Sequence, residues 1–192
     1  MIKELLMILL TSAMINNIVL SYFLGLCPLM GTSKKIGTAA GMGMAVIIAV
    51  TLASAINGAI YEFILLPYKL AFLQTVIFIF VIIAIIKLIA FIMKKLLKKS
   101  YQAIGIYFPV IITNCVILGA VLINVRQTDG VLNHTVNGFA LALGFALVLV
   151  ILAGIRERIA YNDIPESFKG LPILLLIIGL MSMAFFGFSV LL

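Results

Sequence analysis

Long runs of hydrophobic residues, separated by short polar segments, dominate this sequence. Each run is long enough for an α-helix that crosses a membrane, which needs about 20 mostly apolar residues. We therefore predict six transmembrane helices, with the boundaries 5–26, 37–60, 70–93, 101–124, 135–155 and 171–191. The segments between these runs carry charged residues together with glycine or proline, as expected for connections outside the hydrocarbon core.

Composition supports the same class. Hydrophobic residues make up 65% of the 192 residues and charged residues only 10%, whereas soluble domains have roughly 25% charged residues. The sequence thus predicts an all-α integral membrane protein with one membrane domain over residues 1–192. A cleaved signal peptide is not expected, because Lys3 is paired with Glu4 and no cleavage site of small residues follows a short apolar run.

The distribution of basic residues predicts the orientation. The two termini and the second and fourth connections share one side, which carries three basic residues, whereas the other side carries nine. Lys and Arg in short loops favour the cytoplasm, so both termini should lie on the non-cytoplasmic side of the cell (inner) membrane. The net charge of +7 is then explained by topology and contact with anionic membrane lipid, and we expect no nucleic-acid partner.

The two halves of the chain resemble each other at an offset of 97 residues. Asn17-Ile18-Val19-Leu20 aligns with Asn114-Cys115-Val116-Ile117, and the segments that begin at Gly41 and Gly138 also align. Each half, approximately 1–97 and 98–192, contains three spans, so the second half must enter the membrane from the opposite face. The pattern predicts two inverted three-helix repeats with broken first and fourth helices, an architecture that places sites near the membrane midplane.

The only two cysteines, Cys27 and Cys115, lie where these predicted helices are disturbed. Gly25 and Pro28 flank the first, and Pro109 and Thr113-Asn114 precede the second. Thiolates bind zinc, cuprous copper and iron–sulfur clusters, and clusters usually take four cysteines. The pattern therefore indicates half of a metal site completed by a second chain. Two alternatives remain open from the residues alone: inert buried cysteines, and a disulfide between the two.

Other polar residues carry weaker expectations. We expect His134 to be a surface histidine in the fourth connection, and Gly37, Gly41 and Gly43 to form one face for close helix packing. Asn16, Asn17, Thr113 and Asn114 are polar positions within spans that bind neighbouring helices or a cofactor. No carboxylate lies at mid-span, so no proton relay is evident. Catalytic triads and nucleotide-binding fingerprints are also absent from the sequence, so we expect no catalytic residue in this chain.

Two sequence segments resemble the A subunit family of the Rnf electron-transport complexes. The first runs from Asn16-Asn17-Ile18-Val19-Leu20 through Phe23-Leu24-Gly25-Leu26-Cys27-Pro28-Leu29-Met30-Gly31 to Ser33-Lys34-Lys35. The second comprises Tyr107-Phe108-Pro109 and Thr113-Asn114-Cys115-Val116-Ile117-Leu118-Gly119. The resemblance covers essentially the whole chain, and the E subunit of the sodium-pumping NADH:quinone oxidoreductase is also similar.

The resemblance implies a redox function within an enzyme complex. Rnf complexes move electrons between ferredoxin and NAD and couple this to sodium or proton translocation. The implied partners are a homologous E subunit of opposite topology and the B, C, D and G subunits. Cys27 and Cys115 would be metal ligands of a [2Fe–2S] cluster, or of a mononuclear iron, shared with the E subunit. Gly25 and Asn114 would contribute hydrogen-bond donors to that cofactor.

Three other functions are compatible with the sequence. A secondary transporter would also combine inverted repeats with broken helices, and a purely structural subunit would hold no metal. A related complex that reduces a redox-sensing regulator is the third. The coupling ion and the direction of electron flow have no signature in these residues.

Overall fold

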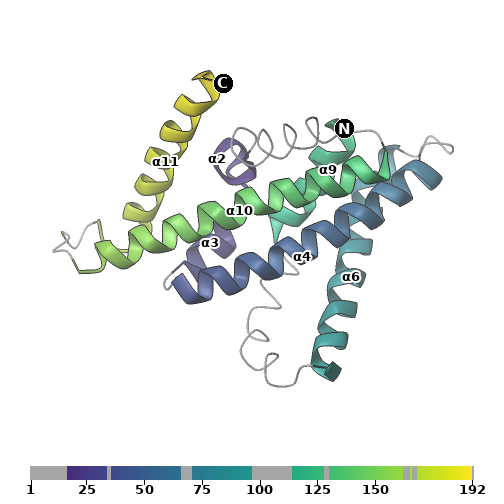
Figure 1. Cartoon of the computed structure of the whole chain (residues 1–192), viewed down its shortest axis with the longest axis horizontal. Coiled ribbons are helices and arrows are strands. Elements are labelled where there is room, and N and C mark those ends of the chain that lie inside the picture. The colour runs from purple at the N-terminus through teal and green to yellow at the C-terminus, as the bar shows by residue number, and fades with distance from the viewer. Residues whose placement is uncertain are drawn as a thin grey trace.

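The computed structural model describes residues 17–33, 36–65, 71–96, 114–127, 130–161, 165 and 168–191. Every regular element in these residues is helical, in agreement with the predicted all-α class (Figure 1). In chain order they are α2 (Ile18–Tyr22), α3 (Leu26–Thr32), α4 (Ile36–Ile60), the π-helical turn η2 (Tyr61–Leu65), the 3-10 turn η3 (Ala71–Leu73), α6 (Gln74–Leu96), α9 (Cys115–Gln127), α10 (Val131–Ile159) and α11 (Leu171–Leu191).

Two of these helices are long and apolar enough to cross a membrane: α4 continued by η2, and α10. They correspond to the second and fifth predicted spans. The shorter apolar helices Gln74–Leu88, Cys115–Arg126 and Leu171–Gly187 fall in the third, fourth and sixth predicted spans. Residues 5–16 and 101–113, which belong to the first and fourth predicted spans, lie outside the described residues. The lengths and apolar composition of these helices are those expected of a helical membrane protein.

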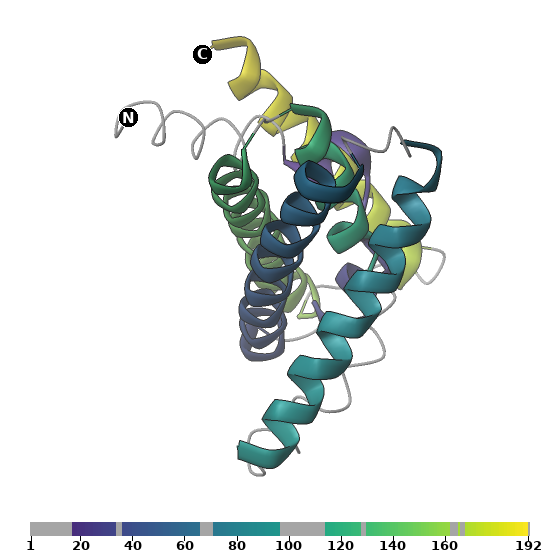
Figure 2. The same cartoon turned by 90° about the vertical axis from the view of Figure 1, so that its right-hand side faces the viewer.

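The centre of the fold is the antiparallel pair α4 and α10, which lie side by side in both views (Figures 1 and 2). Gly43 lies against Ala146, and Gly58 lies against His134, so the two chain directions are opposite. A Cβ atom on Gly43 would lie 3.1 Å from that of Ala146. Because Gly43 and Gly58 have no side chain, the two backbones can approach closely, which is how helices commonly associate in membranes.

The predicted small-residue face of α4 is only partly used. Gly43 is buried against α10, but Gly37 and Gly41 are exposed, and an added Cβ on either would meet nothing within 4 Å among the described residues. The prediction of one packed face was wrong for these two positions. Gly41 and Gly43 are two positions apart, and residues at that spacing on a helix point in different directions.

The predicted break in the first span is present, and it involves two residues in the left-handed region. Phe23 has φ 53° and Gly25 has φ 93°, so α2 ends at Tyr22 and α3 begins at Leu26. Pro28 lies in the first turn of α3, where its missing N–H costs no helical hydrogen bond. Phe23, which ends α2, and Gly25, which precedes α3, therefore break the helix, and Pro28 does not. A Cβ on Gly25 would also collide with the side chain of Val116.

Helix starts recur at the spacing of the predicted repeat. Cys115, the first residue of α9, follows Ile18, the first residue of α2, by 97 positions. Leu171 at the start of α11 follows Gln74 at the start of α6 by the same number. These four boundaries follow the alignment that the sequence predicts.

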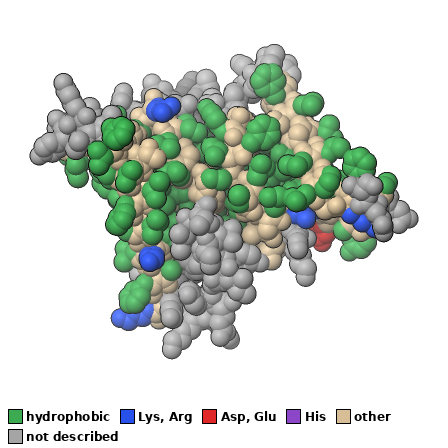
Figure 3. Space-filling view, turned by 180° about the vertical axis from the view of Figure 1, so that it is seen from behind, with side chains coloured by type: hydrophobic (Ala, Val, Ile, Leu, Met, Phe, Trp, Pro, Cys, Tyr) green, Lys and Arg blue, Asp and Glu red, His purple; other side chains and the backbone are tan. Residues whose placement is uncertain are grey.

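Large apolar side chains cover much of the outer surface of the outlying helices α6 and α11, as Figure 3 shows for one face. Phe80 on α6 and Phe186 on α11 are both exposed. Contiguous exposed apolar surface of this extent is unusual for a soluble monomer and fits contact with lipid or with other membrane chains.

We expect Gly43→Leu to destabilise the fold by about 2 kcal/mol or more, because the added side chain overpacks the α4–α10 contact. Gly41→Leu is the matched control on the same helix and should be neutral or stabilising, since its site is open and leucine favours helix over glycine. Thermal unfolding of the purified protein in detergent measures both. Equal losses for the two variants would contradict the packing described here.

Candidate functional site

Cys115 begins α9, and the residue before it sets that boundary. The side-chain oxygen of Asn114 accepts a hydrogen bond from the backbone N–H of Val116 at 3.0 Å. Asn17 does the same at the start of α2, where its oxygen accepts from Val19 at 3.1 Å. An asparagine in this position satisfies a backbone donor that the first helical turn leaves unpaired. Both helices of the predicted repeat therefore start with the same cap.

The break in the first span contacts Cys115 directly. The backbone N–H of Gly25 donates a hydrogen bond to Cys115 Sγ over 3.0 Å. Cys27 follows Gly25 by two positions, in the first turn of α3. Gly25 also lies against Val116 and Phe145, so α9 and α10 hold the break in place. The structure thus brings together three of the four predicted site residues, Gly25, Asn114 and Cys115. The fourth, Cys27, lies two positions after Gly25 in the chain.

The two cysteines differ in exposure. Both are free thiols; Cys27 is exposed, whereas Cys115 is half-buried. Within the described residues, no group of three or more His, Cys, Asp or Glu side chains comes together. This chain therefore offers two soft sulfur ligands, one of them open to a second chain, and a complete site needs further ligands. That donor set fits one half of an iron–sulfur or other thiolate metal site.

An unpaired donor lies beside Cys115. Asn114 is buried, and its Nδ2 has no hydrogen-bond partner among the described residues. In the other cap, Asn17 Nδ2 donates to the carbonyl oxygen of Gly144 at 2.9 Å. A buried donor without an acceptor is costly. An acceptor supplied from outside the described residues, such as a sulfur atom of a bound centre, would satisfy it.

Arg156 on α10 anchors the helix that carries Cys27. Its Nη1 donates to Ser33 Oγ at 2.6 Å and to the Met30 carbonyl oxygen at 3.3 Å. A cation at the carboxyl end of a helix stabilises the carbonyl groups that the last turn leaves unpaired. This positioning role has no local signature in the sequence, because Arg156 and Ser33 are 123 positions apart.

The prediction that His134 is a surface residue was wrong. α10 begins at Val131, four residues before the predicted start of the fifth span, so His134 lies in its first turns and only 1% of its surface is exposed. Its side chain packs against Gly58, and its Nε2 lies 4.0 Å from Glu62 Oε1. Glu62, expected in a connection, lies in η2 directly beyond α4.

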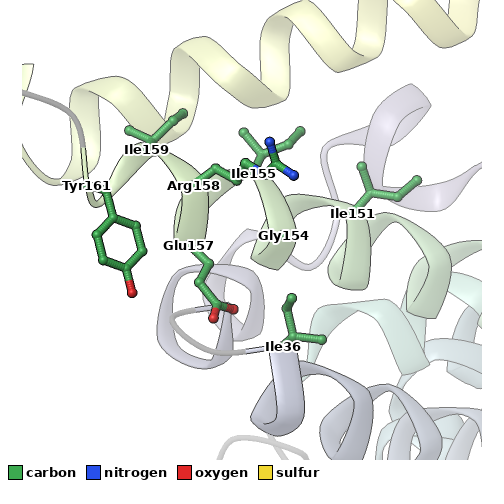
Figure 4. A pocket seen from close by; sticks show the side chains of 8 residues that line it. All are labelled: Ile36, Ile151, Gly154, Ile155, Glu157, Arg158, Ile159 and Tyr161. Carbon is green, nitrogen blue, oxygen red and sulfur yellow. The ribbon is translucent and has the colours of Figure 1, made fainter.

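An open pocket lies at the other end of the α4–α10 pair, and Figure 4 shows the side chains that line it. Ile36 comes from the start of α4, and the remaining lining residues come from the last turns of α10 and from Tyr161 just beyond them. Neither cysteine lines this pocket, so it is separate from the site at the helix break.

Comparison with known proteins identifies the family. The family model described as "Rnf-Nqr subunit, membrane protein" matches residues 5–192. The chain belongs to this Rnf-Nqr family. It is 45% identical over 187 residues to the A subunit of the ion-translocating oxidoreductase complex of Azoarcus sp. (strain BH72), with 97% of each chain covered. It is 46% identical over 185 residues to the A subunit of the Na(+)-translocating ferredoxin:NAD(+) oxidoreductase complex of Acetobacterium woodii, with 96% of each covered.

A third relative, the A subunit of the ion-translocating oxidoreductase complex of Edwardsiella ictaluri, is 47% identical over 184 residues, covering 96% of this chain and 95% of that one. The resemblance to Rnf A subunits that the sequence motifs predicted is thereby confirmed. Some of the residues that carried it lie outside the described residues: Asn16, Lys34, Lys35, Tyr107, Phe108, Pro109 and Thr113.

We expect Arg156→Ala to lower the free energy of unfolding by about 1–3 kcal/mol, because it removes charge-assisted hydrogen bonds to the end of α3. Arg158→Ala is the control; that side chain is exposed two positions further on, and its loss should change stability by less than about 0.5 kcal/mol. Thermal unfolding in detergent compares the two. Indistinguishable variants would show that Arg156 does not anchor α3.

Proposed function

We propose that the chain is the A subunit of an ion-translocating ferredoxin:NAD oxidoreductase complex and carries half of an intramembrane iron–sulfur centre. The observation that carries the proposal is the convergence of the helix break on Cys115, through the hydrogen bond from the Gly25 N–H to Cys115 Sγ. Full-length similarity to relatives named as the A subunits of such complexes supports it. The isolated subunit would not be an enzyme; activity belongs to the complex.

Cys27 and Cys115 are the proposed metal ligands. Two thiolates from this chain and two from a homologous E subunit would complete a [2Fe–2S] site, whereas a mononuclear iron could use the same sulfurs. When bound, such a centre would accept and release one electron at a time between redox subunits on the two membrane faces. The exposed position of Cys27 leaves its sulfur accessible to a second chain.

The residues around the sulfurs have their own roles in this proposal. The Gly25 N–H holds the Cys115 sulfur in one orientation, and the Asn114 amide offers a second donor. Hydrogen bonds to sulfur stabilise negative charge and so raise the reduction potential of iron–sulfur sites. Burial of Val116, Ile117 and Phe145 shields the Cys115 side of the site from water.

For the architecture we propose six spans arranged as two inverted repeats, approximately 1–97 and 98–192, with both termini on the non-cytoplasmic side of the inner membrane. The recurring helix starts and the two asparagine caps support the repeat. An E subunit of opposite topology would then present the matching half-site, and the B, C, D and G subunits would complete the complex. Electron transfer would be coupled to translocation of sodium ions or protons.

The first test is electron paramagnetic resonance with iron and sulfide analysis on the anaerobically purified complex. We expect a reduced iron–sulfur signal that disappears in Cys27→Ser and in Cys115→Ser while the subunits remain assembled. Met183→Leu removes an exposed sulfur on α11 and should leave the signal unchanged. Iron without sulfide would indicate a mononuclear site, and an undiminished signal in either cysteine variant would reject the ligand assignment.

A second prediction concerns the Asn114 amide. Asn114→Ser keeps an oxygen that can cap α9 but removes Nδ2, so the midpoint potential of the bound centre should fall. A hydrogen bond that is about 1 kcal/mol stronger in the reduced state corresponds to about 40 mV for one electron. Asn17→Ser makes the same exchange in the other cap and should leave the potential unchanged. Redox titration of the resonance signal measures both, and an equal shift in the two variants would contradict a specific role.

A further inference from the structure

A group of buried polar side chains lies between α4, α9 and α10, away from the cysteines. Its members are Ser54 and Asn57 on α4, Asn124 on α9, and His134 and Asn137 on α10, and each is at most 2% exposed. α9 packs against both long helices (Figure 1). We refer to these five residues as the polar cluster. Buried polar groups within membrane helices are costly and are commonly functional.

In one part of the polar cluster, two hydrogen bonds join the members to each other. Asn124 Nδ2 donates to the carbonyl oxygen of His134, and Asn137 Nδ2 donates to Asn124 Oδ1 at 3.1 Å. These bonds hold the amide of Asn124 in one orientation across the helix interface. Asn124 and Asn137 are therefore held in place on the α9–α10 side of the cluster.

On the α4 side of the polar cluster, two oxygen atoms lack a hydrogen-bond partner within the part of the chain that the structure describes. Asn57 Nδ2 donates to the Ala53 carbonyl oxygen at 2.8 Å, but Asn57 Oδ1 and Ser54 Oγ have no hydrogen-bond partner among the described residues. Ser54 and Asn57 are 1% and 0% exposed and three positions apart, so they lie on one face of α4. Ser54 packs against Gly138, and Asn124 Nδ2 lies close to the same glycine.

These two oxygens need a partner that the described side chains do not supply. A buried acceptor left unpaired costs free energy, and natural proteins normally satisfy it with water or an ion. Hydroxyl and amide oxygens are hard ligands that suit hard cations. Ca²⁺ sites draw on several carboxylates, whereas here the adjacent acidic side chain is Glu62, which is 28% exposed at the end of the cluster. This ligand set therefore favours a monovalent cation.

We propose that Ser54 Oγ and Asn57 Oδ1 are ligands of a monovalent cation of the Na⁺ type that keeps part of its water shell. Asn124 on α9 and Asn137 on α10 lie on the side of the ion opposite α4. Glu62, two positions after the last residue of α4, attracts the ion by its negative charge. The inference rests on the proposed function in one respect, since an ion-translocating complex needs a cation site within its apolar core. Its location is independent of the cysteines: Asn124 follows Cys115 by nine positions on α9, which is about 14 Å along a helix.

Binding of ²²Na⁺ to the purified complex in sodium-free choline buffer tests the proposal. We expect Ser54→Ala and Asn57→Ala to weaken one class of Na⁺ sites by about tenfold or more, with the number of ions bound per complex falling by one at limiting concentration. Thr51→Val is the matched control. It removes a hydroxyl one turn earlier on α4 that already donates to its own helix, at the Ile47 carbonyl oxygen, and should bind Na⁺ as the wild type does.

A second readout keeps the test decisive if a variant assembles poorly. Asn57→Asp preserves the size of the side chain and adds a negative charge, so it should tighten Na⁺ binding and increase the Na⁺-dependent rise in Tm. Wild-type Na⁺ stoichiometry and affinity in Ser54→Ala, or unchanged binding in Asn57→Asp, would overturn the proposal and leave the polar cluster as a water-filled structural site. The resonance signal of the same samples reports the cysteine site separately, so failure of either proposal can be told from failure of the other.

Discussion

Helices that lie side by side in a membrane gain little from burying apolar surface against each other, because lipid chains are equally apolar. Close backbone approach and buried polar contacts must hold them instead. α4 and α10 meet both conditions, through Gly43, Gly58 and Gly138 and through the polar groups between them. The remaining elements of the site depend on this pair: Phe145 of α10 packs on the helix break, and Arg156 of α10 anchors α3.

A broken helix within a membrane must satisfy the backbone groups that the break frees. One of them, the Gly25 N–H, is satisfied by sulfur and not by oxygen. The same contact therefore serves two purposes, because it stabilises the break and fixes the orientation of Cys115. The Cys115 sulfur is oriented by the fold of this chain alone, so the proposed E subunit would meet one ligand that is already arranged.

Sequence patterns predicted much of this organisation because the signals were local. Runs of about 20 apolar residues identify spans, and Gly25 marks the break. The two asparagines at one offset were predicted only as polar positions within spans, because their role as helix caps depends on helix starts that the apolar runs do not show. The prediction failed for His134 because α10 starts four residues earlier than the apolar run suggests, and that shift moves the side chain from a connection into the helix interface. Arg156 and the polar cluster could not be predicted, since their partners are distant in sequence and only packing brings them together.

The residues of the open pocket and of the polar cluster occupy matching positions in the two halves of the predicted repeat. At the offset of 97 residues, four pocket-lining residues match residues at or near the polar cluster. Ile151 matches Ser54, Gly154 matches Asn57, Ile155 matches Gly58, and Ile159 matches Glu62. Under the proposed duplication, these are two copies of one helix crossing, and apolar residues occupy the positions in the second copy that match Ser54, Asn57 and Glu62 in the first. Two identical halves in inverted orientation would make the two membrane faces equivalent. Divergence at this crossing would then give the two membrane faces different side chains, which any vectorial process requires.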